Sequence, residues 1–152
     1  MATHLEPPSG RFEGALHLFP VRVYFEDTDL SGVAYHANYL KWFERARSDL
    51  LRLLGVDQRA AQEAGEGVYA VADLQIRYLA PARLDDTIIV RSRPLELGAA
   101  SARLLQQAWR EDSLLAEMNV RVGFISPEGR PRRQPQAWRD AFSSLIADQG
   151  TA

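Results

Sequence analysis

The sequence predicts an α+β domain in which an antiparallel sheet of five strands wraps around one long central helix, with a further helix at the C-terminus. Between residues 38 and 54, apolar side chains recur every three or four positions, which is typical of an amphipathic helix. Four runs of alternating apolar and polar residues then follow with short connections. Strands joined in this way pair antiparallel, and the helix has the apolar stripe needed to cover one face of their sheet.

The first predicted strand leads into the central helix. Val21, Val23 and Phe25 alternate with more polar residues, which is the pattern of a strand with one buried face. Asn38 is the expected N-cap of the helix, and Gly55 is the expected left-handed residue after its last turn. The apolar stripe between these ends comprises Tyr39, Phe43, Ala46, Leu50 and either Leu53 or Leu54.

The remaining elements follow the long helix in order. A short helix is expected over residues 57–64, ended by Gly65. The four later strands are expected over residues 72–79, 87–93, 101–109 and 114–125. Pro127 and Gly129 mark a turn after the last strand, and Pro135 opens the C-terminal helix. One face of that helix is formed by Trp138, Ala141, Phe142 and Leu145.

The length of 152 residues fits one domain, expected over residues 15–147 between tails at residues 1–14 and 148–152, the first of them flexible. A net charge of -2 at pH 7 gives no electrostatic basis for binding nucleic acid. The long helix is too charged to be a membrane span. Cysteine is absent, and the N-terminus has no apolar stretch typical of a signal peptide. These features predict a cytoplasmic protein without disulfides, a thiolate nucleophile or cysteine-ligated zinc.

The loop before the long helix contains the strongest candidates for chemistry. Asp29 and His36 flank Gly32 close to the helix start, where unpaired backbone N–H groups and the helix dipole stabilise negative charge. The alternative is that these residues have only local roles, because aspartates commonly form turns and His36 could cap the helix. We expect Asp27 to be such a turn former, since one carboxylate is enough for the chemistry.

The same loop is also similar to the beginning of a calcium-binding EF-hand. Asp27, Asp29, Ser31 and Gly32 have the residue types and spacing of its first ligands and its glycine. The twelfth position, which should be a bidentate glutamate, is Asn38, and the preceding segment alternates like a strand. We therefore expect no metal site.

Residues 21–55 and 72–90 carry a resemblance to a known family. From Asp27 to Tyr39 the chain reads D-x-D-x-x-G-x-x-x-H-x-N-Y. This pattern resembles the signature of the hotdog-fold acyl-CoA thioesterases, specifically the 4-hydroxybenzoyl-CoA thioesterase family and its Tol-Pal-associated branch, of which His36 is typical. The resemblance implies a hotdog fold assembled as a homodimer or homotetramer. It also implies hydrolysis of an acyl-CoA, or of an acyl carrier protein thioester, without a cofactor.

The resemblance further implies roles for individual residues. Asp29 corresponds to the catalytic carboxylate, which acts as nucleophile or general base. His36 corresponds to the residue whose backbone N–H binds the thioester carbonyl. The neighbouring substrate contacts are expected at Gly32, Tyr35, Ala37 and Asn38.

The phosphate groups of CoA require a second site. Some aryl-CoA members of the family carry basic residues in the turn before the fourth strand, where this chain has only glycine and alanine at residues 98–100. Arg132 and Arg133, next to Arg130, are the alternative candidates. The competing interpretation is that this arginine run is simply solvated.

Two other functions stay open at this point. A hotdog domain can be a non-catalytic module that binds acyl or CoA ligands, and it can be a hydratase that acts on the acyl chain without cleaving the thioester. Release of thiol distinguishes a thioesterase from both, because fold alone does not decide function.

Overall fold

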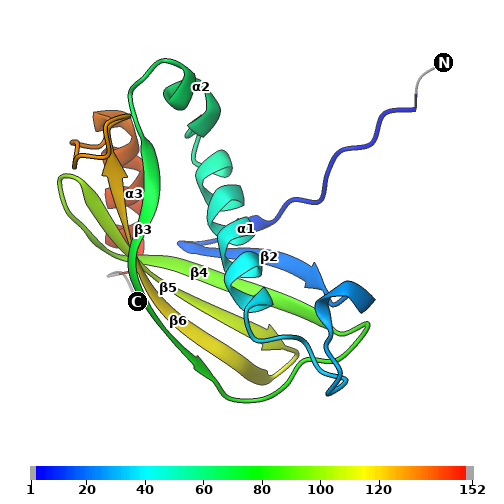
Figure 1. Ribbon diagram of the computed structural model, residues 1–152. Helices are drawn as coiled ribbons and strands as arrows, with labels where there is room; N and C mark the ends of the chain where they lie inside the picture. The colour runs from blue at the N-terminus through cyan, green and yellow to red at the C-terminus, as the bar shows by residue number, and fades with distance from the viewer. Residues whose placement is uncertain (1–2, 150–152) are drawn as a thin grey trace.

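The computed structural model describes residues 3–149 of the chain. Within them, six antiparallel strands form one curved sheet, and a long helix lies along one face of it (Figure 1). The strands are β1 (Arg11–Glu13), β2 (Leu16–Arg22), β3 (Val68–Tyr78), β4 (Thr87–Leu97), β5 (Ser101–Arg110) and β6 (Ser113–Ile125). Their order across the sheet is β1-β2-β4-β5-β6-β3. The helices are α1 (Asn38–Leu53), α2 (Gln58–Glu63) and α3 (Gln136–Gln149), and a 3-10 turn covers Phe25–Asp27.

The central helix α1 buries one apolar face against the sheet. That face includes Tyr39, Trp42, Phe43, Ala46 and Leu50. The helix ends as predicted, because Gly55 has a φ of +83° and the N–H of Val56 donates to the C=O of Leu51 at 2.9 Å. Of the two alternatives for the end of the stripe, Leu54 packs against the core, whereas Leu53 is exposed. No helix within residues 3–149 is long and apolar enough to cross a membrane.

The face of the sheet that meets α1 provides the rest of the core. Alternate residues of β5 and β6 are buried, as the two-residue period of a strand requires. They are Ala102, Leu104, Gln106 and Ala108 in β5, and Ala116, Met118, Val120, Val122 and Phe124 in β6. Phe142 of α3 joins the same core cluster. This burial holds α1 in place on the sheet, and it thereby positions the loop that precedes the helix.

The sheet has six strands within the described residues, so the expected number of five is wrong. The additional strand β1 pairs with β2 through a turn at Gly14, whose φ is +60°. Phe12 is the only apolar residue of β1, and prolines precede it, so the strand has little periodicity to detect. β1 therefore occupies part of the expected tail at residues 1–14. The tail expected at residues 148–152 begins inside α3, and its part beyond Gln149 lies outside the described residues.

The first strand also ends earlier than the alternation suggested. Val21 and Val23 are buried as predicted, but β2 ends between them and Phe25 begins the 3-10 turn with its side chain 82% exposed. The carboxylate of Asp27 closes this turn by accepting a hydrogen bond from the N–H of Tyr24 at 2.8 Å. A local side-chain bond thus replaces strand pairing at this point.

β3 is an edge strand. It pairs with β6 on one side, with a bulge between Val71 and Asp73, and its other side pairs with no strand in the described part of the chain. Val71 and Leu74 are apolar yet 48% and 40% exposed. β3 and β4 follow each other in sequence but are not neighbours in the sheet, so the connection between them crosses from this edge to the interior. An exposed apolar edge of this length is a surface on which another strand can pair.

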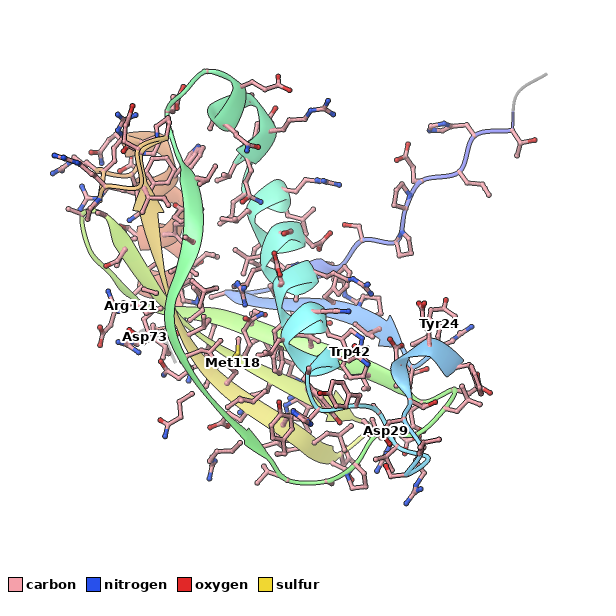
Figure 2. All side chains as sticks on the ribbon, viewed as in Figure 1. Tyr24, Asp29, Trp42, Asp73, Met118 and Arg121 are labelled. Atoms are coloured by element: carbon pink, nitrogen blue, oxygen red, sulfur yellow. The ribbon has the colours of Figure 1, made fainter. Side chains whose placement is uncertain are left out.

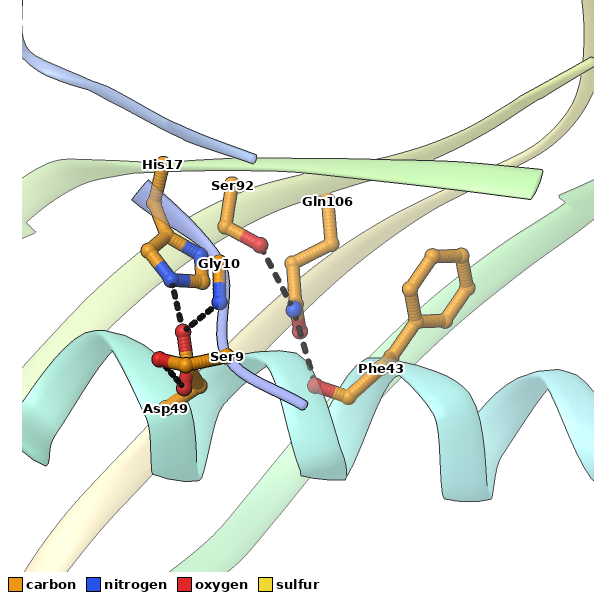
Figure 3. Close-up of polar contacts among 7 residues, drawn as sticks. All are labelled: Ser9, Gly10, His17, Phe43, Asp49, Ser92 and Gln106. Carbon is orange, nitrogen blue, oxygen red and sulfur yellow. Dashed lines mark hydrogen bonds and ion pairs between the residues drawn. The ribbon is translucent and has the colours of Figure 1, made fainter. Parts of the chain in front are cut away.

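Buried polar groups fasten the N-terminal segment to α1. The carboxylate of Asp49 accepts hydrogen bonds from the hydroxyl of Ser9 at 2.7 Å and from the N–H of Gly10 at 2.9 Å (Figure 3). It also bonds Nε2 of His17, which is fully buried, at 2.7 Å. The segment before β1 therefore has a defined course over the helix.

Candidate active site

Residues 28–37 form the loop that leads into α1. Thr28 pairs with Ala34, and the N–H of Ala34 donates to the C=O of Ala82 at 2.8 Å. Gly32, with a φ of +82°, allows the chain to reverse between them, and its N–H donates to the C=O of Asp29 at 3.0 Å. Figure 2 shows Asp29 in this loop, at the end of the molecule where α1 begins. Backbone hydrogen bonds thus hold both arms of the loop, and Asp29 lies in the exposed part between them.

Asp29 is exposed to solvent and is held by Ser31. Its Oδ1 accepts hydrogen bonds from the hydroxyl of Ser31 and, at 2.8 Å, from the N–H of Ser31. The hydroxyl first, then the N–H, lower the pKa of Asp29 below its ordinary value, and nearby His36 lowers it further. Its Oδ2 has no hydrogen-bond partner among residues 3–149. Asp29 is therefore ionised at neutral pH and keeps one oxygen available.

Asp27 has different contacts, which are those of a turn former. In addition to the bond that its carboxylate makes to the turn, its C=O accepts from the N–H of Tyr35 and from the side-chain amide of Asn38, both at 2.8 Å.

The expectation that Asn38 is the N-cap is wrong, because Ala37 occupies that position. Asn38 is the first residue of α1, and its buried amide donates to the loop instead of accepting from the helix. Within residues 3–149, no three histidine or acidic side chains are grouped to hold a metal.

The side chain of His36 is exposed and lies among tyrosines. Its ring centroid is 4.5 Å from that of Tyr35 and 6.0 Å from that of Tyr78. The hydroxyl of Tyr78 donates to the backbone C=O of His36 at 2.8 Å. In the sequence, Tyr78 is only one residue of the strand expected over residues 72–79. The one signal for a further role was its position at the end of that strand, where a tyrosine can extend its hydroxyl beyond the sheet.

Two backbone N–H groups before the first turn of α1 are unpaired. The N–H of Asn38 donates to the C=O of Tyr35, but those of His36 and Ala37 have no acceptor in the described part of the chain. Unpaired N–H groups at the start of a helix attract negative charge. One exposed loop therefore combines the ionised carboxylate of Asp29 with two available donors.

Arg132 and Arg133 lie at the other end of α1. The guanidinium of Arg132 donates to the C=O groups of Gly65 and Glu66, at 2.9 and 2.7 Å, just beyond α2. The 16 residues of α1, about 24 Å of helix, separate this segment from the loop at residues 28–37. Within one chain, therefore, the structure does not bring these arginines together with Asp29.

A cavity of about 320 Å³ lies between the second half of α1 and the first half of β3. The cavity has apolar walls formed by Leu51, Val71 and Leu104 and a charged wall formed by Arg47. The guanidinium of Arg47 is fixed there, because its Nη1 donates to the buried Oε1 of Gln106 at 2.9 Å. The volume is in the range of small-molecule sites, roughly 300–1,000 Å³.

Comparison with known proteins identifies relatives of this chain. The sequence pattern of the thioesterase superfamily matches residues 31–117. Acyl-CoA thioesterase YbgC of Haemophilus influenzae is 38% identical over 128 residues, which cover 84% of this chain and 94% of that protein. Acyl-CoA thioesterase YbgC of Helicobacter pylori strain J99 is 39% identical over 135 residues, covering 83% and 96%. The crystal structure of a probable thioesterase from Bartonella henselae is 36% identical with a TM-score of 0.76, covering 79% of this chain and 99% of that one.

Proposed function

Because the chain belongs to the thioesterase superfamily, we propose that it hydrolyses the thioester of an acyl-CoA to a free carboxylic acid and CoA. The observation that carries this proposal is the pairing of an ionised carboxylate, Asp29, with unpaired N–H groups at the start of α1. The chain has the hotdog architecture, with a sheet curved around one long helix. Its lack of cysteine suits an enzyme that works in the cytoplasm.

Asp29 supplies the general base or the nucleophile of the proposed reaction. As a base, its carboxylate accepts a proton from water while the water oxygen attacks the thioester carbon. As a nucleophile, its free Oδ2 attacks that carbon, and water then hydrolyses the resulting anhydride. In both routes the C–S bond breaks, and CoA leaves as a thiolate that is protonated afterwards. Both routes require ionised Asp29, which the hydrogen bonds from Ser31 favour.

The N–H groups of His36 and Ala37 are the proposed donors to the negative charge that develops on the carbonyl oxygen. They are part of the backbone, so they are oriented before substrate binds, and each such donor is worth about 10²- to 10³-fold in rate. The exposed ring of His36 has room to orient water or to protonate the leaving thiolate. The loop thus contains the groups that thioester hydrolysis needs.

The proposed assembly is a homodimer, or a dimer of such dimers, formed through β3. Its outer edge is unpaired in the described residues and carries exposed apolar side chains. Two copies of this edge can pair antiparallel about a two-fold axis, which extends the sheet across both protomers. This arrangement would cover Val71 and Leu74.

This dimer would complete the site. Antiparallel pairing about the middle of β3 places the Tyr78 end of one protomer opposite the Val68 end of its partner. The catalytic loop lies at the Tyr78 end, since Tyr78 bonds to His36, whereas the cavity beside α1 lies at the Val68 end. We therefore propose that the acyl group enters the partner's cavity while its thioester lies at Asp29.

The same two-fold arrangement also suggests where the phosphates of CoA bind. Ile125, the last residue of β6, pairs with Val68, so the arginine segment that follows β6 lies at the cavity end of β3. Across the two-fold axis, Arg132 and Arg133 of one protomer would lie near the catalytic loop of the other. Arg132 already donates to two carbonyl groups, which leaves Arg133, with its exposed side chain, as the better phosphate ligand.

A thiol-release assay over short, long and aromatic acyl-CoA thioesters, and an acyl carrier protein thioester, tests the function. We expect stoichiometric release of thiol and free acid from at least one class. Binding of these ligands without thiol release would indicate a non-catalytic binding module. A change in enoyl absorbance without thiol release would indicate a hydratase.

Light scattering and activity of a Leu74→Lys variant test the assembly. Lysines brought together across the two-fold axis should repel, so we expect dissociation to a 17.1 kDa protomer and loss of activity. Leu53→Lys is the matched control, because Leu53 is similarly exposed, at 43%, but lies on α1. A fully active monomer would contradict the shared site.

A further inference from the structure

Tyr78 has no part in the reaction described above, but it contacts the peptide group that carries one of the proposed donors. Its hydroxyl donates to the C=O of His36 at 2.8 Å. That C=O and the N–H of Ala37 belong to one planar trans peptide group, so they point in opposite directions. The N–H of Ala37 therefore points away from Tyr78, and it cannot rotate without breaking this hydrogen bond.

The position of Tyr78 is fixed by the sheet and the core, not by the loop. Tyr78 is the last residue of β3 and pairs with Ala116 of β6. Its ring meets the ring of Tyr39 edge to face, with centroids 5.4 Å apart, and Tyr39 is only 3% exposed. Tyr78 is 44% exposed, but partial burial still raises its pKa, so the hydroxyl remains protonated and able to donate at neutral pH.

We propose that Tyr78 is a positioning residue for thioester hydrolysis, whose hydroxyl orients and polarises the N–H of Ala37 as a donor to the oxyanion beside the N–H of His36. A carbonyl that accepts a hydrogen bond polarises the amide N–H of the same peptide group. The inference rests on the proposed function and adds the group that holds one donor in place. It explains why an exposed loop keeps a defined donor geometry.

The kinetic test is Tyr78→Phe, which keeps the ring and removes the hydroxyl. We expect kcat to fall about tenfold, since a single hydrogen bond that orients one donor is lost. KM should stay within about twofold of the wild-type value, because the donor acts on charge that develops in the transition state. An unchanged kcat, or a raised KM with unchanged kcat, would overturn the inference.

A second measurement needs no substrate. In ¹⁵N NMR spectra of the whole protein, Tyr78→Phe should shift the amide resonance of Ala37, because the carbonyl of the same peptide group loses its donor. Ser9→Ala is the control, since it removes a 2.7 Å hydrogen bond from a hydroxyl to Asp49 on α1, outside both β3 and the loop. We expect that variant to leave the Ala37 resonance in place. Equal shifts in both variants, or none in either, would contradict a specific effect of Tyr78.

Failure of the proposed function would look different from failure of this inference. If the wild-type protein releases no thiol from any thioester, the proposed function fails and the role of Tyr78 fails with it. If the wild type is active, Asp29→Asn is inactive and Tyr78→Phe has full activity, the function stands and the role of Tyr78 is wrong.

Discussion

The molecule contains two aspartate–histidine pairs that are built in opposite ways. Asp49 and His17 are buried and joined by a 2.7 Å hydrogen bond, and Asp49 also accepts bonds from the segment before β1 (Figure 3). Asp29 and His36 lie on an exposed loop and share no hydrogen bond within the described residues. The first pair joins segments of the fold, whereas the second has unused hydrogen-bonding capacity.

The protonation states follow from these environments. Burial lowers the pKa of His17, and this outweighs the opposing effect of Asp49. Burial also opposes ionisation of Asp49, but hydrogen bonds from Ser9, His17 and Gly10 outweigh it and lower the pKa of Asp49. A neutral His17 thus donates through Nε2 to an ionised Asp49, and its buried Nδ1 has no partner among residues 3–149. The pair that suits catalysis is the one whose acceptor oxygen remains free.

The largest effect expected is that of Asp29→Asn on activity. The amide has nearly the same shape but neither attacks nor accepts a proton at neutral pH, so kcat for thiol release should fall about a thousandfold. The denaturant midpoint should remain that of the wild type, because Asp29 is exposed. Asp27→Asn is the matched control and should reduce activity far less. A greater loss in Asp27→Asn would reverse the assignment within the pair.

Asp49→Ala should have the opposite effect to Asp29→Asn, lowering the stability of the protein while leaving its activity nearly unchanged. It leaves Ser9, Gly10 and His17 without their shared acceptor, so the free energy of unfolding should fall by about 2–4 kcal/mol. At a temperature where the variant is folded, its kcat should remain close to the wild-type value. Urea titration and thiol-release kinetics on the same preparation check both parts. Unchanged stability would show that the buried pair is not a structural bridge.

His36→Ala should have an intermediate effect on activity. The side chain is lost but the backbone N–H survives, so we expect a fall in kcat of about tenfold, well short of the Asp29→Asn loss. His36→Pro removes the N–H itself and should be more damaging. Steady-state kinetics of the two variants separate the roles of ring and backbone. Full activity in His36→Ala would exclude a chemical role for the ring.

The smallest effect is a shift in pH dependence caused by Ser31→Ala. Removing the hydroxyl takes away the main cause of the lowered pKa of Asp29, so that pKa should move up towards its ordinary value of 3.8. Since the proposed reaction requires ionised Asp29, the acid limb of the profile of kcat/KM against pH should move to higher pH. Activity at neutral pH should change little. An acid limb that does not move would show that Asp29 does not control it.

Much of the fold could be predicted from local periodicity, and the failures have local causes. The buried stripe of α1 and the alternation of β6 are regular over more than ten residues, so they are clear in the sequence, whereas β4 continues to Leu97, beyond the expected end at Arg93. β1 has only three residues, and a 3-10 turn interrupts the alternation that includes Phe25. Asn38 has the residue type of an N-cap but is used as a donor to Asp27.

Residues close together in the chain specify the order of the main elements, the loop before α1 and the candidacy of Asp29 and His36, so these features could be predicted without the structure. Long-range packing brings His17 to Asp49, 32 residues away, and Tyr78 to His36, 42 residues away, and neither contact could be predicted from the sequence. The same packing also places β3 at an edge of the sheet, although β4 follows it in sequence. Burial and strand order arise from packing between distant segments, and no local pattern of residues encodes them.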